Sequence, residues 1–138
     1  MNKTILVVDD EVLIAKMIAE VLSDEGYVVQ VAFDWLSGLQ TLTSTNEDFG
    51  LVICDYRLPG GTGLELLQEL KKKKGHAPSF LFITGLMDFP QGDAPEIIGS
   101  LTKPLDLDHL IQLIHTYFIG HQPVGLQNSP QIAIGKKI

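Results

Sequence analysis

The sequence predicts an α/β protein built on a mostly parallel sheet with helices on both faces. Four short apolar runs, rich in β-branched or aromatic residues, are typical of buried strands: Ile5 to Val8, Tyr27 to Ala32, Leu51 to Cys54 and Phe80 to Ile83. Segments with apolar residues at helical spacing separate these runs. Parallel neighbours need crossovers, and right-handed crossovers place the helices on alternate faces. The alternation therefore predicts this fold class.

The helical segments are marked by their periodicity and by their ends. Apolar residues recur at helical spacing at Ile14, Ile18, Val21 and Leu22, at Leu64, Leu67 and Leu70, and at Leu107, Leu110, Ile111, Ile114 and Phe118. Gly26 and Gly75 follow two helical segments, where a left-handed cap is expected. Asp34 and Asp106 precede two others, where a carboxylate can cap the first backbone N–H groups.

The sequence signals for the fifth strand and for a helix in the crossover before it are weak. Leu101 and Thr102 are the only signal for that strand. The segment from Asp88 to Gly99 contains two prolines and two glycines, which oppose a regular helix. We therefore expect a short, irregular or mobile fourth helix. Five strands in this arrangement fit a flavodoxin-like doubly wound sheet with strand order 2-1-3-4-5.

The length of 138 residues fits one domain with a short extension. Hydrophobic residues make up 45% of the chain, enough to fill one core. From Gly120 onward the periodicity is lost, and prolines and glycines are frequent. We expect a domain over residues 1–119, and a tail or the beginning of a linker over residues 120–138.

Composition excludes several classes of function. A formal net charge of −7 argues against nucleic-acid binding through this chain, which needs clustered Lys and Arg. The basic run Lys71 to Lys74 is interpreted as a helix end. Cys54 is the sole cysteine, so no intrachain disulfide can form. No apolar stretch approaches the roughly 20 residues that cross a bilayer, and no signal peptide pattern is present. We expect a soluble, cytoplasmic protein that does not enter membranes.

Five polar residues follow or end the predicted strands. Asp9 and Asp10 come after the first strand, Asp55 ends the third, Thr84 the fourth and Lys103 the fifth. In an open α/β sheet the carboxyl ends of the strands share one edge, and ligands bind there. The topology therefore predicts that three carboxylates, a hydroxyl and an ammonium meet at one place.

Three neighbouring carboxylates repel one another unless a positive charge intervenes. Mg²⁺ prefers hard oxygen ligands and typically uses one or two carboxylates together with phosphate oxygens. We expect Asp10 and Asp55 to bind Mg²⁺ directly and Asp9 to hold a metal-bound water. Lys103 on the far side leaves a position between two positive charges for a phosphoryl group, to which Thr84 can donate.

Each of these residues also has an ordinary structural interpretation. An Asp-Asp-Glu string is a common helix start, and Asp55 before Tyr-Arg-Leu-Pro is compatible with a simple turn. Thr84 before Gly85 and the pair Lys103-Pro104 are ordinary strand-end and loop residues. Their common place at one edge of the sheet favours a functional site over these separate interpretations.

These residues resemble the response-regulator receiver family. The resemblance covers Lys3 to about Phe118 and rests on the acidic pair, Asp55, Thr84 and the Lys103-Pro104 pair. It implies that Asp55 is the phosphoacceptor, Asp9 and Asp10 the Mg²⁺-binding pair, Thr84 the switch hydroxyl and Lys103 the phosphate-sensing lysine. It also implies that the backbone carbonyl of Arg57 completes the metal shell.

The resemblance implies a signalling switch rather than an enzyme with an external substrate. The expected partner is a sensor histidine kinase or a phosphotransfer protein, and turnover is limited to self-catalysed phosphotransfer and dephosphorylation. The family commonly has an aromatic ring three residues before the lysine, but Ser100 stands there. We therefore expect readout through another surface or through an order–disorder change of Asp88 to Gly99. Dimerisation through the face of the fourth and fifth strands stays open.

Three other functions fit parts of the pattern. A Mg²⁺-dependent phosphatase or phosphotransferase usually has a second Asp two residues after its nucleophile, where this chain has Arg57. A flavin-binding module on the same sheet needs a loop rich in Ser, Thr and Gly after the first strand, but this loop is acidic. A degenerate receiver that only binds proteins is disfavoured by the complete set of site residues.

Overall fold

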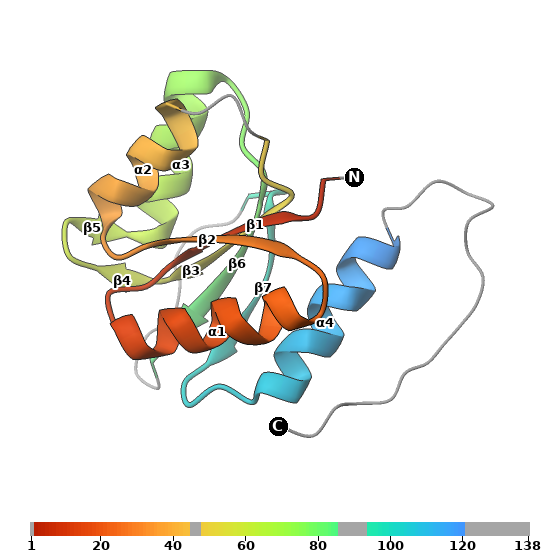
Figure 1. Cartoon of the computed structure of the whole chain (residues 1–138). Coiled ribbons are helices and arrows are strands. Elements are labelled where there is room, and N and C mark those ends of the chain that lie inside the picture. The colour runs from red at the N-terminus through yellow and green to blue at the C-terminus, as the bar shows by residue number, and fades with distance from the viewer. Residues whose placement is uncertain (1, 45–47, 86–93, 121–138) are drawn as a thin grey trace. The chain divides into compact units, whose positions relative to one another are not determined.

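A computed structural model describes residues 2–44, 48–85 and 94–120. Within the unit Asn2–Pro104 a parallel sheet has the order β2-β1-β3-β6-β7. Its strands are β1 (Thr4–Val8), β2 (Val28–Ala32), β3 (Leu51–Asp55), β6 (Ser79–Thr84) and β7 (Ile97–Thr102). Counting only these five strands, the order is 2-1-3-4-5, so the predicted flavodoxin-like topology is confirmed (Figure 1).

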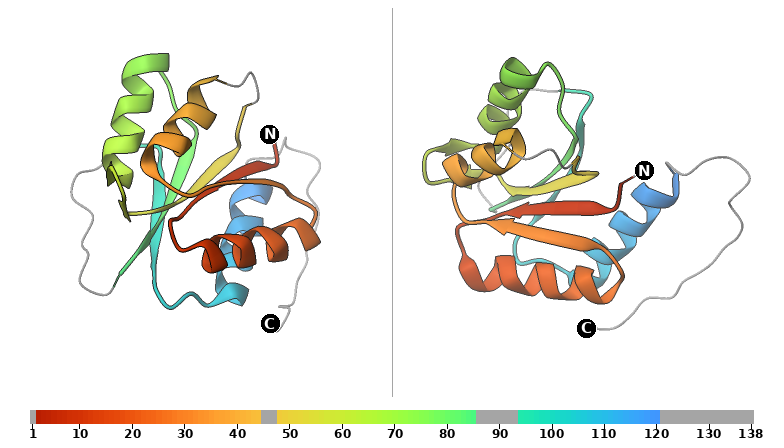
Figure 2. Two further views of the ribbon diagram at one scale, coloured as in Figure 1. Left: turned by 60° about the vertical axis from the view of Figure 1, so that its left-hand side comes forward. Right: turned by 45° about the horizontal axis from the view of Figure 1, so that its top comes forward.

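Helices of the same unit cover both faces of the sheet. α1 (Val12–Asp24) lies on one face, and α2 (Trp35–Ser44) and α3 (Gly63–Lys74) lie together on the other (Figure 2). A second unit contains α4 (Leu107–Gly120), whose residues Leu110, Ile111, Ile114 and Phe118 are buried as the periodicity predicts. None of the helices in the described part of the chain has the length and apolar character needed to cross a membrane.

The predicted helix ends are confirmed by their hydrogen bonds and dihedral angles. The side chain of Asp34 accepts from the Ser37 N–H at 2.7 Å, and that of Asp106 accepts from the His109 N–H at 3.2 Å. Gly75 caps α3 in the left-handed conformation with φ of 83°. These short-range signals could be recognised in the sequence because each depends on residues within one helical turn.

The fifth strand is longer than predicted. It runs from Ile97 to Thr102, because hydrogen bonds to the neighbouring β6 extend it through Gly99 and Ser100, which have weak strand propensity. Ile98 is an extra residue in the register, since Phe80 pairs with Ile97 and Leu81 pairs with Gly99. The expected irregular crossover therefore ends earlier, in a turn before Ile97, and residues 86–93 lie outside the described part.

A short hairpin follows β3 where the sequence indicated only a turn. β4 (Arg57–Leu58) pairs antiparallel with β5 (Gly61–Thr62). Trp35 of α2 holds this hairpin, because its backbone N–H donates to the Pro59 carbonyl at 3.2 Å and its indole N–H donates to the Thr62 carbonyl at 3.2 Å. Thr62 and Glu65 then form a capping box that begins α3.

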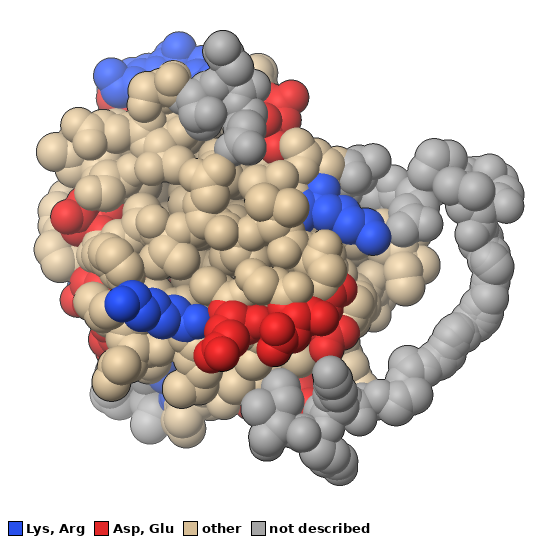
Figure 3. Space-filling model, in the orientation of Figure 1, with Lys and Arg blue, Asp and Glu red and all other residues tan. Residues whose placement is uncertain are grey.

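The basic run at the end of α3 is a helix end, as predicted. In Figure 3 a group of basic side chains lies at the top of the molecule, where α3 ends. Lys71 pairs with Glu96 at 3.2 Å, and Lys72 and Lys73 lie 3.7 and 3.8 Å from Glu69 carboxylate oxygens. The predicted tail falls on residues 121–138, outside the described residues, and the domain boundary at residue 119 stays a prediction.

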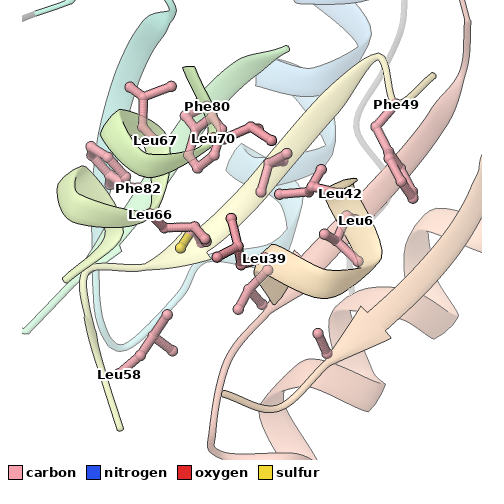
Figure 4. Close-up of a cluster of buried hydrophobic side chains, with 14 of the residues drawn as sticks. Leu6, Leu39, Leu42, Phe49, Leu58, Leu66, Leu67, Leu70, Phe80 and Phe82 are labelled. Carbon is pink, nitrogen blue, oxygen red and sulfur yellow. The ribbon is translucent and has the colours of Figure 1, made fainter. Parts of the chain in front are cut away.

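A closely packed cluster fills the space between the sheet and the helices α2 and α3 (Figure 4). It joins the inward faces of β1, β3 and β6 to buried leucines of the two helices: Leu39 and Leu42 of α2, and Leu66, Leu67 and Leu70 of α3. Gly63, the first residue of α3, packs against Phe82 and Cys54 of this cluster. A Cβ atom at Gly63 would lie 2.7 Å from Cε1 of Phe82.

Substitution of Gly63 should therefore destabilise the domain. We expect Gly63→Ala to lower the free energy of unfolding by about 1 to 3 kcal/mol, because overpacking forces Phe82 from its place. Urea denaturation followed by circular dichroism measures this change. The control is Gly120→Ala, where an added Cβ atom meets nothing within 4 Å and stability should stay the same or rise slightly. Equal stability of the parent and Gly63→Ala would contradict the packing argument.

Candidate functional site

The carboxyl ends of four neighbouring strands carry the polar residues that the sequence singled out. Asp9 follows β1, Asp55 ends β3, Thr84 ends β6 and Lys103 follows β7. Backbone hydrogen bonds join these strand ends to their neighbours: Asp9 N–H to Ala32 carbonyl at 3.0 Å, Tyr56 N–H to Ile83 carbonyl at 2.8 Å and Lys103 N–H to Thr84 carbonyl at 2.8 Å. The sheet therefore fixes the backbone of each site residue.

Lys103 is the centre of the site. Its Nζ lies 3.0 Å from Oδ2 of Asp55, 3.5 Å from Oδ2 of Asp9 and 2.6 Å from Oε2 of Glu11. In the sequence, Lys103 is 48 positions from Asp55 and 92 positions from Glu11. The expected convergence of Asp9, Asp55 and Lys103 is therefore present in the structure.

The acidic group differs in one member from the predicted one. Carboxylate oxygens of Asp9, Glu11 and Asp55 all lie within 4.8 Å of one another. Asp10 is exposed and is not part of this group. The sequence pattern indicates Glu11 only as part of a helix start. The available signal was its place as a third consecutive acid after β1, directly before α1.

One oxygen of Asp9 lacks a hydrogen bond although it is buried. Oδ1 of Asp9 accepts from the Glu11 N–H at 2.9 Å, but Oδ2 has no hydrogen-bond partner and only the ion-pair distance of 3.5 Å to Lys103. Buried carboxylate oxygens are normally satisfied by donors or by a cation. An unsatisfied oxygen beside two further carboxylates fits a hard divalent ion with its own water shell, so the donor set suits Mg²⁺.

Thr84 and Arg57, two further residues of the predicted site, each make a hydrogen bond near the strand ends. The Thr84 hydroxyl is buried and donates to the Leu101 carbonyl at 3.4 Å, across the β6–β7 pair. The Arg57 backbone N–H donates to Oδ1 of Asp55 at 3.4 Å. This contact places the Arg57 backbone next to the Asp55 carboxylate. The predicted roles of the Arg57 carbonyl and of Asp10 as metal ligands stay predictions.

Burial and crowding decide the electrostatics of the site. The pKa of Asp55 is raised to about 6, chiefly by burial and also by the Asp9 charge, and the hydrogen bond from Lys103 offsets this rise only in part. Burial also raises the pKa of Asp9. Burial by itself lowers the pKa of Lys103, but the hydrogen bonds with Glu11 and Asp55 outweigh it, and the net shift is upward. The site thus holds more negative charge than Lys103 can compensate.

Comparison with known proteins agrees with this geometry. The sequence matches the response regulator receiver domain family over residues 5–115. The chain belongs to this family. Receiver domains belong to response regulators of two-component signalling, and the family interacts with histidine kinases or phosphotransfer proteins.

Two relatives and one solved structure illustrate how far this receiver domain resembles others. Sporulation initiation phosphotransferase F of Bacillus subtilis is 30% identical, covering 85% of this chain and 94% of that protein. The probable transcriptional regulator ycf29 of Porphyra purpurea is 32% identical over 97% of this chain and 67% of its own length. The response regulator TrrA of Thermotoga maritima, solved with Mg(2+)-BeF, has a TM-score of 0.68 and 32% identity, covering 83% of this chain and 97% of that one.

Other relatives extend well beyond the matched region. The receiver domain spans 48% of the transcriptional regulatory protein YkoG of Bacillus subtilis and 25% of the transcriptional regulatory protein GlrR of Escherichia coli. The same domain therefore occurs both nearly alone and as part of longer regulators.

The raised pKa of Asp55 predicts a pH-dependent stability difference for Asp55→Asn. A folded-state pKa of about 6, above the ordinary value of 3.8, means that stability falls as pH rises through that window, because ionisation is disfavoured in the folded protein. Asn does not ionise. In EDTA we expect the variant to exceed the parent in Tm at pH 7.5 by roughly 3 °C or more. At pH 4 this difference should shrink, since Asp55 is then protonated in the folded parent.

Thermal melts followed by circular dichroism measure this difference at each pH. The control is Glu20→Gln, which removes an exposed carboxylate of α1 away from the site. Its Tm should track that of the parent at both pH values. A stability difference between Asp55→Asn and the parent that is the same at pH 4 and pH 7.5 would count against the raised pKa.

Proposed function

We propose that this receiver domain accepts a phosphoryl group on Asp55 and uses the modified state as a signal. The observation that carries the proposal is the buried Asp55 carboxylate, which is 3.0 Å from the Lys103 ammonium and belongs to a group of three acids with buried Asp9 and exposed Glu11. A carboxylate beside an ammonium at the ligand-binding edge of the sheet is placed to act as a nucleophile toward phosphorus. The expected donor is a phosphohistidine on a sensor histidine kinase or a phosphotransfer protein.

Asp9, Asp55 and the Arg57 backbone carbonyl, together with the exposed Asp10, are the groups proposed to hold Mg²⁺. Asp10 lies outside the group formed by Asp9, Glu11 and Asp55, so its side chain has to turn inward to bind. Bound Mg²⁺ supplies positive charge beside the oxygens of the transferring phosphoryl group. Burial keeps water away from Asp9 and Asp55, which strengthens any such interaction.

Phosphotransfer then needs little covalent work from the protein. An Asp55 carboxylate oxygen forms a bond to phosphorus while the bond from phosphorus to the histidine nitrogen breaks, and its electron pair leaves with the imidazole. The Lys103 ammonium neutralises charge on the equatorial oxygens. Attack by water on phosphorus later releases inorganic phosphate and restores the Asp55 carboxylate. Positioning and electrostatics therefore account for the chemistry.

Thr84 is proposed to couple the phosphoryl group to the β6–β7 edge. Its hydroxyl now donates to the Leu101 carbonyl, so turning toward a phosphoryl oxygen removes a contact between the two strands. Ser100, exposed on β7, offers no ring to fill the space that Thr84 leaves. Readout without such a ring is proposed to use another surface, and dimerisation through this edge is one form that it can take.

We further propose that the domain acts in the cytoplasm, has no external substrate and does not bind nucleic acid itself. The net charge of −7 supports the last point. A phosphatase acting on external esters is less well supported, because exposed Arg57 stands where such an enzyme has a second acid. Sustained release of product from a phosphoester such as p-nitrophenyl phosphate would revive the enzyme alternative.

The proposed function predicts a covalent product at Asp55. After incubation with acetyl phosphate and Mg²⁺, intact mass spectrometry should show one added phosphoryl group on the parent. Asp55→Asn should gain none, because an amide oxygen is a much weaker nucleophile than a carboxylate. EDTA should reduce modification of the parent at least tenfold. A parent that gains no mass, or gains it equally in the Asn variant, would refute Asp55 as the acceptor.

Calorimetric titration with Mg²⁺ separates the proposed ligands from their neighbours. Asp9→Asn and Asp10→Asn should each weaken Mg²⁺ binding, by about tenfold for a directly bound or water-bridged carboxylate. Glu20→Gln serves as the control for loss of one negative charge on the surface and should leave the affinity within twofold of the parent. An unchanged affinity in Asp10→Asn would remove Asp10 from the metal site.

A further inference from the structure

Glu11 stands on the open side of the buried site. Its side chain is 53% exposed, whereas the side chains of Asp9, Asp55 and Lys103 are 2%, 9% and 18% exposed. It nevertheless makes the shortest of the three carboxylate contacts with Lys103, at 2.6 Å. The outermost acid of the group therefore holds the ammonium that the proposed chemistry requires.

The side chain of Glu11 is directed to Lys103 and not to its own helix. Glu11 is the N-cap residue of α1, yet it makes no capping hydrogen bond with its side chain. The residues that usually cap a helix in this way are Asp, Asn, Ser and Thr, and Glu is not among them. The α1 N-terminus thus has no side-chain cap from Glu11, whose carboxylate pairs with Lys103.

Lys103 already donates hydrogen bonds to two carboxylates before any phosphoryl group arrives. An ammonium has three N–H donors. Glu11 and Asp55 each accept one, and Oδ2 of Asp9 lies 3.5 Å away as an ion pair without a hydrogen bond. A phosphoryl oxygen on Asp55 therefore competes with these carboxylates for the ammonium. Glu11 is the easiest to displace, because an exposed ion pair contributes little and its carboxylate is rehydrated on release.

The negative charge of Glu11 also repels an incoming phosphoryl group. Three carboxylates and one ammonium give the contact group a formal charge of −2, from three negative charges and one positive charge. Phosphoryl groups and their donors are anionic. Glu11 contributes one of the negative charges at the open side, where an anion has to enter.

We propose that Glu11 is a positioning residue that holds the Lys103 ammonium in the unphosphorylated receiver domain and competes with the phosphoryl group for it. This inference rests on the proposed function of Asp55 and Lys103. Release of Glu11 is then part of activation, and the Glu11–Lys103 pair biases the domain toward its unmodified state. Glu11 itself touches neither the phosphorus nor the nucleophilic oxygen in this scheme.

The test compares affinity for beryllofluoride, an anion that mimics the phosphoryl group, at saturating Mg²⁺. Glu11→Gln should bind it about two- to fivefold more tightly than the parent, the range expected for loss of one exposed ion pair. Glu20→Gln, the same chemical change two turns along α1, should match the parent. Glu11→Asp keeps the charge but is one methylene shorter and a better N-cap, so it should bind beryllofluoride more tightly than the parent and less tightly than Glu11→Gln.

Two further measurements test whether Glu11 acts on Lys103 and not as a metal ligand. In EDTA, the NMR signal of the Lys103 ammonium should shift in Glu11→Gln and stay in place in Glu20→Gln, since this readout does not depend on metal or on phosphotransfer. Calorimetric Mg²⁺ affinity of Glu11→Gln should stay within about threefold of the parent, because loss of a direct ligand typically costs tenfold or more.

The outcomes separate this inference from the proposed function. A parent that neither binds beryllofluoride nor accepts phosphate from acetyl phosphate overturns the proposed function and this inference with it. A parent that does both, with Glu11→Gln unchanged or weaker, overturns only the inference. So does a Glu11→Asp variant that matches the parent, a Lys103 signal that does not move, or a tenfold loss of Mg²⁺ affinity in Glu11→Gln, which would make Glu11 a metal ligand.

Discussion

The contact between the Lys103 ammonium and the Asp55 carboxylate is the constraint on which the site depends. It joins the ends of β3 and β7, which are separated by β6 in the sheet. The distance of 3.0 Å requires β3, β6 and β7 to be in register at their carboxyl ends. Parallel pairing of β3 with β6 and of β6 with β7 provides that register, and the Lys103 N–H to Thr84 carbonyl bond extends it past the last strand residue.

The hydrophobic core of the domain offsets the unfavourable free energy of placing the carboxylates of the site close together. Buried carboxylates oppose folding, as the raised pKa values of Asp9 and Asp55 indicate. The continuous core between the sheet, α2 and α3 supplies the hydrophobic stabilisation that offsets them. A cation beside the three acids would relieve this repulsion directly.

The connection after β3 is more ordered than a loop. Trp35 bridges α2 to the β4–β5 hairpin, and the capping box of Thr62 and Glu65 fixes where α3 begins. Gly60 and Gly61 are in close contact with the Trp35 side chain, so larger residues would push the hairpin away. The Arg57 backbone beside Asp55 is therefore held by packing from α2 and α3. The geometry next to Asp55 thus depends on packing residues outside the acidic group.

The sequence by itself determined the strand order, the cap residues and the gathering of Asp9, Asp55, Thr84 and Lys103 at one edge. These follow from local periodicity and from the rule that parallel strands share their carboxyl edge. Only the tertiary structure decided that β7 begins at Ile97, that Arg57 starts a hairpin, and that Glu11 and not Asp10 faces Lys103. Strand length depends on hydrogen bonds to a neighbour, and the choice between adjacent acids depends on side-chain direction. Neither is encoded in spacing along the chain.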